Sequence, residues 1–151
     1  MTGKIILAMV MVAGLLFSAD DPFSGTWVLN HSKSRLPPPA PKSLIARMAV
    51  NGSDIEVEEE IISDSGQRFA VHVKARFDGK DYAITGSPVA DTVAYERLDR
   101  NTIRGVAKKS GKVIAYEKAV ISPDGKSMTG TNSGTDESGQ QILAVYVLEK
   151  K

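Results

Sequence analysis

Short turn signals divide this chain at regular intervals, and they constrain its fold more than any other feature of the sequence. Six pairs end in glycine, at Asn51-Gly52, Ser65-Gly66, Asp78-Gly79, Ser110-Gly111, Asp124-Gly125 and Ser138-Gly139; a seventh signal without glycine is Asp99-Arg100-Asn101. Most of them are about 11 to 14 residues apart, which is one strand plus one turn. Glycine supplies the positive φ of tight turns, and Asn, Asp or Ser hydrogen-bonds to the local backbone. The spacing therefore predicts β-hairpins.

The segments between these turns are rich in Val, Ile, Thr, Tyr and Phe, and no window after the first 19 residues has helical periodicity. Strands are predicted near residues 25–30, 43–50, 54–62, 67–77, 80–85, 92–98, 102–109, 112–121, 126–133 and 140–149. Such a series predicts an all-β fold, an antiparallel up-and-down meander of about 8–10 strands. A sheet of that length usually closes into a barrel, which removes its edges.

The segment QRFAVHVKARF has the clearest strand pattern. Phe69, Val71, Val73, Ala75 and Phe77 alternate with the polar side chains of Arg68, His72, Lys74 and Arg76. This alternation predicts a strand with one face in the core and one in water.

The first 19 residues resemble a secretory signal peptide. Lys4 precedes the apolar run IILAMVMVAGLLF, and small and acidic residues follow from Ser18 to Asp21. The run is shorter than the roughly 20 apolar residues of a membrane span. We therefore expect a signal helix over residues 1–19, one mature domain over residues 20–151, and an exported, periplasmic or extracellular protein; an uncleaved anchor is the alternative.

Composition excludes several partners and chemistries. The chain has no cysteine, so disulfides, thiol chemistry and cysteine-ligated zinc are excluded. It has 19 basic and 18 acidic residues, and loss of Lys4 with the leader leaves 18 of each. Without a basic block, nucleic acid and anionic membranes are not expected partners. We expect a monomer with no membrane span in the mature protein.

A proline-rich segment, His31 to Ser43, separates the first two predicted strands. Pro37, Pro38, Pro39 and Pro41 cannot donate the hydrogen bonds of a sheet. The segment is expected to avoid helix and central strand and to cross the surface as polyproline II.

Gly25-Thr26-Trp27 follows the leader and contains the only tryptophan. It resembles the G-x-W signature that opens the first strand of lipocalins and related barrels, including small exported bacterial proteins called lipocalin-like. The resemblance implies that Gly25 and Trp27 form a structural plug at the closed end of the barrel. In that family an arginine from a late strand often covers the tryptophan. The last strand here lacks one, so Arg97 or Arg104 is expected to substitute. The helical lid of fatty-acid-binding barrels is also missing, so their ligand is not implied.

No catalytic or metal site is predicted from motifs. His31 and His72 are the only histidines, and neither has a convergent set of ligands or a nucleophile beside it in the sequence. We expect His72 to be a solvated surface residue, and we expect no enzyme activity, no metal and no cofactor.

Two acidic residues interrupt otherwise apolar faces. Strict alternation turns Glu59 inward with Ile55 and Val57, and Glu117 shares its parity with Ala115 and Ala119. Two inward carboxylates would hold a polar ligand or act as an acid and a base. The interpretation we favour is a bulge near Glu59 and a two-sided strand near Glu117, because an unpaired buried carboxylate costs several kcal/mol.

The leading functional hypothesis is an exported barrel that binds a small, largely apolar molecule. The alternative is a filled, ligand-free structural or interaction barrel of the cell envelope, and a large cavity would favour the first hypothesis. The candidate ligand-binding residues are Met48, Phe69, Val71, Val73, Phe77, Tyr82, Tyr95 and Tyr146.

Overall fold

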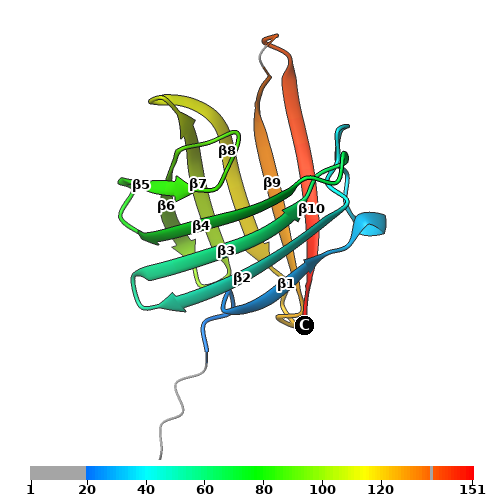
Figure 1. Cartoon of the computed structure of the whole chain (residues 1–151). Helices are drawn as coiled ribbons and strands as arrows, with labels where there is room; N and C mark the ends of the chain where they lie inside the picture. The colour runs from blue at the N-terminus through cyan, green and yellow to red at the C-terminus, as the bar shows by residue number, and fades with distance from the viewer. Residues whose placement is uncertain (1–19, 137) are drawn as a thin grey trace, which may run out of the picture.

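The computed structural model describes residues 20–136 and 138–151, which form a ten-stranded antiparallel sheet (Figure 1). The predicted leader, residues 1–19, lies outside the described residues. The elements are β1 (Gly25–Leu29), the short 3-10 helix η1 (His31–Lys33), β2 (Ser43–Asn51), β3 (Asp54–Ile62), β4 (Arg68–Arg76), β5 (Asp81–Thr85), β6 (Thr92–Asp99), β7 (Thr102–Lys109), β8 (Lys112–Ile121), β9 (Ser127–Thr135) and β10 (Gln141–Lys150).

The sheet closes into a barrel, as predicted. Each strand pairs with its neighbour in sequence, and β1 also pairs with β10 to complete the ring β1-β10-β9-β8-β7-β6-β5-β4-β3-β2. At the closure Trp27 is opposite Lys150, and on its other side it is opposite Ala46. Closure leaves no strand of the ring as a free edge, which suppresses edge-to-edge aggregation.

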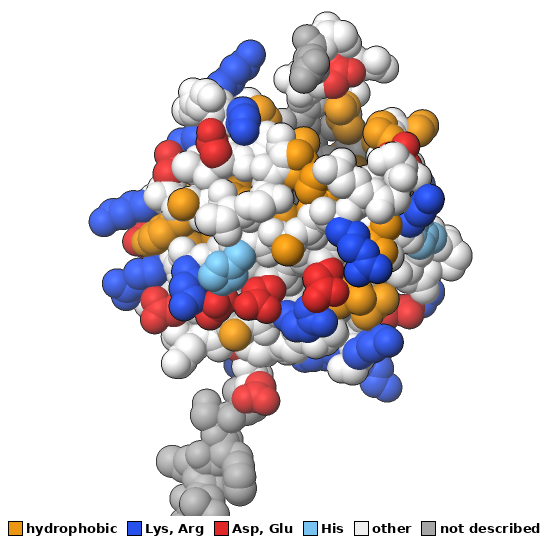
Figure 2. Space-filling model, viewed as in Figure 1, with side chains coloured by type: hydrophobic (Ala, Val, Ile, Leu, Met, Phe, Trp, Pro, Cys, Tyr) orange, Lys and Arg blue, Asp and Glu red, His pale blue; other side chains and the backbone are white. Residues whose placement is uncertain are grey.

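Side chains alternate between core and solvent as the sequence pattern indicated. In β4, Val73 and Ala75 are buried, whereas Arg68, Lys74 and Arg76 are exposed. On the face over β2 to β4, acidic and basic side chains are interspersed (Figure 2). Charged pairs there, such as Arg47 with Glu60, bridge adjacent strands.

A tryptophan-centred plug closes the end of the barrel where β1 begins. Trp27 and Phe23 are fully buried, and the Trp27 indole Nε1 donates a hydrogen bond of 2.9 Å to the Phe23 carbonyl. The expected arginine cover is wrong, because Lys150 of β10 places its ammonium 5.1 Å from the Trp27 ring centroid. Lysine can fill this role because its long stem covers apolar surface while its charge faces the ring.

The two arginines considered for that cover have other partners. The Arg97 guanidinium lies 5.5 Å from the Phe23 ring centroid and 5.6 Å from that of Phe77. It donates to both carboxylate oxygens of Asp21, at 2.5 and 3.1 Å. Arg104 pairs with Glu96 on the surface.

The proline-rich segment crosses the opposite, open end. It starts with the helix η1, which was not expected; this turn precedes the prolines, and the Asn30 side chain caps it. Arg35 then forms an isolated bridge with Val145, and the His31 ring lies within hydrogen-bond distance of the Lys42 carbonyl, at 2.9 Å. The rest of the segment lies outside the strands until β2 begins at Ser43, and the Lys42 backbone N–H donates a 2.8 Å hydrogen bond to the Ile62 carbonyl of β3.

Within the described residues, no helix has the length and hydrophobicity needed to cross a bilayer.

Candidate ligand-binding cavity

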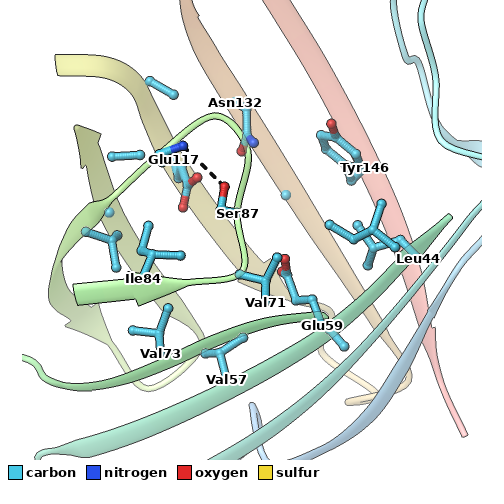
Figure 3. A pocket seen from close by; sticks show the side chains of 18 of the residues that line it. Leu44, Val57, Glu59, Val71, Val73, Ile84, Ser87, Glu117, Asn132 and Tyr146 are labelled. Atoms are coloured by element: carbon cyan, nitrogen blue, oxygen red, sulfur yellow. Dashed lines mark hydrogen bonds between the residues drawn. The ribbon is translucent and has the colours of Figure 1, made fainter. Parts of the chain in front are cut away.

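A cavity of about 650 Å³ occupies the inside of the barrel (Figure 3). Its apolar wall includes Val57, Val71 and Val73. Pro39 and Pro41 of the proline-rich segment line its open end. The volume is within the range of about 300–1,000 Å³ that is typical of small-molecule sites.

Six of the eight candidate ligand-binding residues line this cavity, and they are Met48, Phe69, Val71, Val73, Tyr95 and Tyr146. Two do not. Phe77 lies just beyond β4 and packs beneath Arg97 near the plug. The Tyr82 hydroxyl donates a 2.7 Å hydrogen bond to Asp78 Oδ2 at the β4–β5 turn. Residue type and strand alternation do not reveal how far along the barrel a side chain lies.

Glu59 points into the cavity from β3, and the favoured bulge is wrong. The β2–β3 and β3–β4 registers run without interruption through Glu59, which is opposite Ala46 on one side and Val71 on the other. Irregularities occur instead between β6 and β7 and between β7 and β8. With regular alternation on both sides, the Glu59 side chain has no route to the outer surface.

Glu117 also points inward, from β8. It is opposite Gly105 of β7 and Asn132 of β9. Gly105 leaves the space that this arrangement needs. A Cβ there would lie 3.3 Å from Glu117 Oε2 and 3.2 Å from the Tyr95 ring, tighter than ordinary contacts. The small residue thus accommodates the Tyr95 ring and the Glu117 carboxyl against the same wall.

The two carboxyl groups come from opposite walls (Figure 3). In the ten-membered ring, β3 and β8 are five strands apart in either direction. Among the described residues, neither carboxyl group has a side-chain hydrogen bond or an ion pair, and no hydrogen bond contributes to either pKa shift. Both therefore face the cavity space with their acceptor positions free.

Burial controls the charge of this pair. Desolvation raises the pKa of Glu59, and desolvation together with the charge of Glu59 raises the pKa of Glu117 to about 7. Burial likewise raises the pKa of the Tyr95 and Tyr146 hydroxyls, which stay protonated. Near neutral pH the pair can bind or release a proton readily, because the second ionisation is opposed by low dielectric and like charge.

Parity was the sequence signal for both carboxyls. It was outweighed by the cost of placing a carboxylate in a packed core. In the structure both side chains point into a cavity, and desolvation raises both pKa values, so the less costly neutral form is favoured.

The outer face of β3 and β4 carries a separate acidic group. His72 Nε2 lies 2.8 Å from Glu56 Oε1. Glu58 lies nearby, so that one potential metal-ligand atom from each of these three residues lies within 4.8 Å of the other two. The His72 and Glu56 side chains are 41% and 40% exposed, so the expectation of a surface histidine is confirmed. The hydrogen bond from His72 lowers the pKa of Glu56. Lys74 Nζ, 3.8 Å from Glu56, supplies a competing cation.

No protein-family model matches the chain, and a search of curated proteins gave no significant match.

Proposed function

We propose that this protein binds one small, largely apolar molecule inside its barrel. The observation that carries the proposal is the 650 Å³ cavity, whose wall is mostly apolar and which opens beside the proline-rich segment. Barrels of about this size have room for one small ligand.

Small side chains on adjacent strands keep the interior open. Gly105 of β7, Ala119 of β8 and Gly130 of β9 all line the cavity. Leucine or phenylalanine at such positions would fill the space. This pattern argues against the alternative of a filled structural barrel, because close-packed interiors leave few voids larger than a water molecule.

The G-x-W resemblance at Gly25 and Trp27 supports the same proposal, since lipocalin-like barrels commonly carry ligands between their walls. We further propose an exported, monomeric protein that binds without turnover. The leader-like sequence of residues 1–19 supports export.

The test is titration with N-phenyl-1-naphthylamine, a probe that is uncharged at neutral pH and fluoresces in apolar sites. Gly130→Leu should fill the cavity and weaken binding at least about tenfold. A Cβ at Gly130 meets only Tyr146, at 3.8 Å, so the backbone can accept a side chain. Thr129→Leu, one residue away on the exposed face, is the matched control and should bind as the wild type does.

Native mass spectrometry of the purified protein complements this titration and should reveal a retained small molecule. The proposal fails if the wild type neither retains a ligand nor binds the probe. It also fails if Gly130→Leu folds and binds the probe unchanged.

A further inference from the structure

We propose that the cavity selects a molecule with one positive charge on an apolar body, such as a protonated alkylamine, and that Glu59 and Glu117 hold this charge between them. The inference rests on the proposed function and assigns its ligand class.

The charged groups around the cavity are mostly acidic. Glu59 and Glu117 project into it from opposite walls, and exposed Asp64 borders the open end. Lys118 is the only basic residue among those that line the cavity in the described chain. Lys118 follows Glu117 in β8, so its side chain points to the opposite, outer face of the strand, where it is exposed. An anionic ligand would meet two acids and no facing cation.

A ligand cation would supply what the carboxyl groups lack. Each has free acceptor positions, and an ammonium group has three donors and no acceptor. The Tyr95 and Tyr146 side chains also line the site, and aromatic faces attract cations. The Asn132 side chain, opposite Glu117 in the register, adds a carbonyl acceptor.

The rest of the wall favours an organic cation over a metal ion. Hard divalent cations take six or more oxygen ligands. Here the residues nearest the acids are largely hydrocarbon, including Val57, Val71 and Ile84. An alkyl chain buries that surface while its ammonium group meets the acids.

The ionisation of the Glu59–Glu117 pair favours a ligand with one positive charge. The pKa of Glu117 is raised to about 7 and that of Glu59 is raised as well, so two full negative charges are disfavoured at neutral pH. A bound ammonium would lower both pKa values, and binding near pH 7 should therefore release protons.

The experiment compares octylamine, octanol and octanoate by isothermal titration calorimetry at pH 7.5. These probes share a chain and differ in the charge of the head group. Octylamine should bind at least about tenfold more tightly than octanol, and octanoate most weakly. Repeating the octylamine titration in buffers of different ionisation enthalpy should show proton release.

The double variant Glu59→Gln/Glu117→Gln should lower octylamine affinity to that of octanol and leave octanol binding near its wild-type value. Glu58→Gln/Glu60→Gln removes two carboxylates from the exposed face of the same strand and is the matched control. It should retain the preference for octylamine.

A pH series on the wild-type protein gives a second test that needs no variant. Octylamine remains protonated between pH 5 and 8, so its advantage over octanol should shrink as the carboxyl groups take up protons toward pH 5.

The outcomes separate the two proposals. If octanol or octanoate binds as tightly as octylamine, the charge preference is wrong and the proposed function stands. If the preference for octylamine survives in the Glu59/Glu117 double variant, these residues do not hold the charge. If none of the three probes binds, and the naphthylamine probe also fails, both proposals fall.

Discussion

The indole of Trp27 contacts groups that lie far apart in the sequence. Its Nε1 is bonded to the Phe23 carbonyl, its ring lies beneath the Lys150 ammonium, and none of its surface is exposed. Burial and a satisfied indole N–H together make it the anchor of the closed end.

Trp27→Ala should lower the free energy of unfolding by about 3–5 kcal/mol, the range of large aromatic truncations in cores. Trp27→Phe keeps a ring but loses the bond to Phe23 and should cost less. Chemical denaturation measures both changes. The native wild type should have the blue-shifted emission of a buried tryptophan, and a spectrum typical of exposed tryptophan would contradict the assignment.

Glu117 makes stability depend on pH, and the sign follows from its raised pKa. The native state holds the Glu117 proton more tightly than the unfolded chain does, so this contribution to stability is fully present below the ordinary pKa of 4.5. It is lost as pH rises toward the native pKa of about 7. The loss is on the order of 3 kcal/mol, at about 1.4 kcal/mol per pKa unit.

In the wild type, ionisation of Glu117 should lower the free energy of unfolding between about pH 4.5 and 7, and Glu117→Gln should abolish this decline. The measurement is the difference in unfolding free energy between variant and wild type at each pH. Taking the difference cancels the surface carboxyls common to both proteins. Glu58→Gln, on the exposed face, should leave the wild-type profile intact. A Glu117→Gln profile parallel to that of the wild type would show that Glu117 titrates normally.

At the scale of elements, the proline-rich segment and the β5–β6 loop border the mouth of the cavity. Pro39 and Pro41 line it from one loop, and Ser87 and Val89 line it from the other. Val89 is 65% exposed although it is apolar. The structure places Pro39 and Pro41 at the open end, where they line the cavity.

Replacing Pro37, Pro38 and Pro39 by Gly and Ser should loosen this border and change ligand exchange rates more than stability. The loss of stability should be no more than about 1–2 kcal/mol, since it arises from greater freedom of the unfolded chain. Stopped-flow displacement of N-phenyl-1-naphthylamine measures exchange. Unfolding of the variant would show that the segment is core structure, and unchanged exchange would reduce it to a connector.

For the whole molecule, the described N-terminal residues form part of the plug. Asp21 pairs with Arg97, and Phe23 is fully buried beside Trp27. The Arg97 and Asp21 side chains are only 20% and 19% exposed, so their ion pair is screened less than one on the surface.

We predict that the protein is exported and that its mature form begins near Asp20, because a start there retains both contacts. Amino-terminal sequencing of exported material measures this. Recovery of Met1 intact in a membrane fraction would contradict it. A start beyond Phe23 would also contradict it, since the barrel would lose the part of the plug that Phe23 forms.

The sequence by itself determined the strands, their order and the closed barrel, because turns and alternation are local. The bounds of β3 (Asp54–Ile62), β7 (Thr102–Lys109) and β8 (Lys112–Ile121) match the predicted ranges, and the other strands differ by at most two residues at an end. Six of the eight candidate ligand-binding residues also line the cavity. The leader, the ligand and export remain predictions.

Only the tertiary structure decided which groups meet across the barrel. Lys150 covers Trp27 because closure pairs the last strand with the first. Glu59 and Glu117 face one another because β3 and β8 are diametrically placed around an interior that glycine keeps open. Their burial is tolerated because the raised pKa values favour the neutral carboxyl form, which costs less to desolvate than a carboxylate. Packing density and long-range register set that space, and neither is encoded in a local pattern.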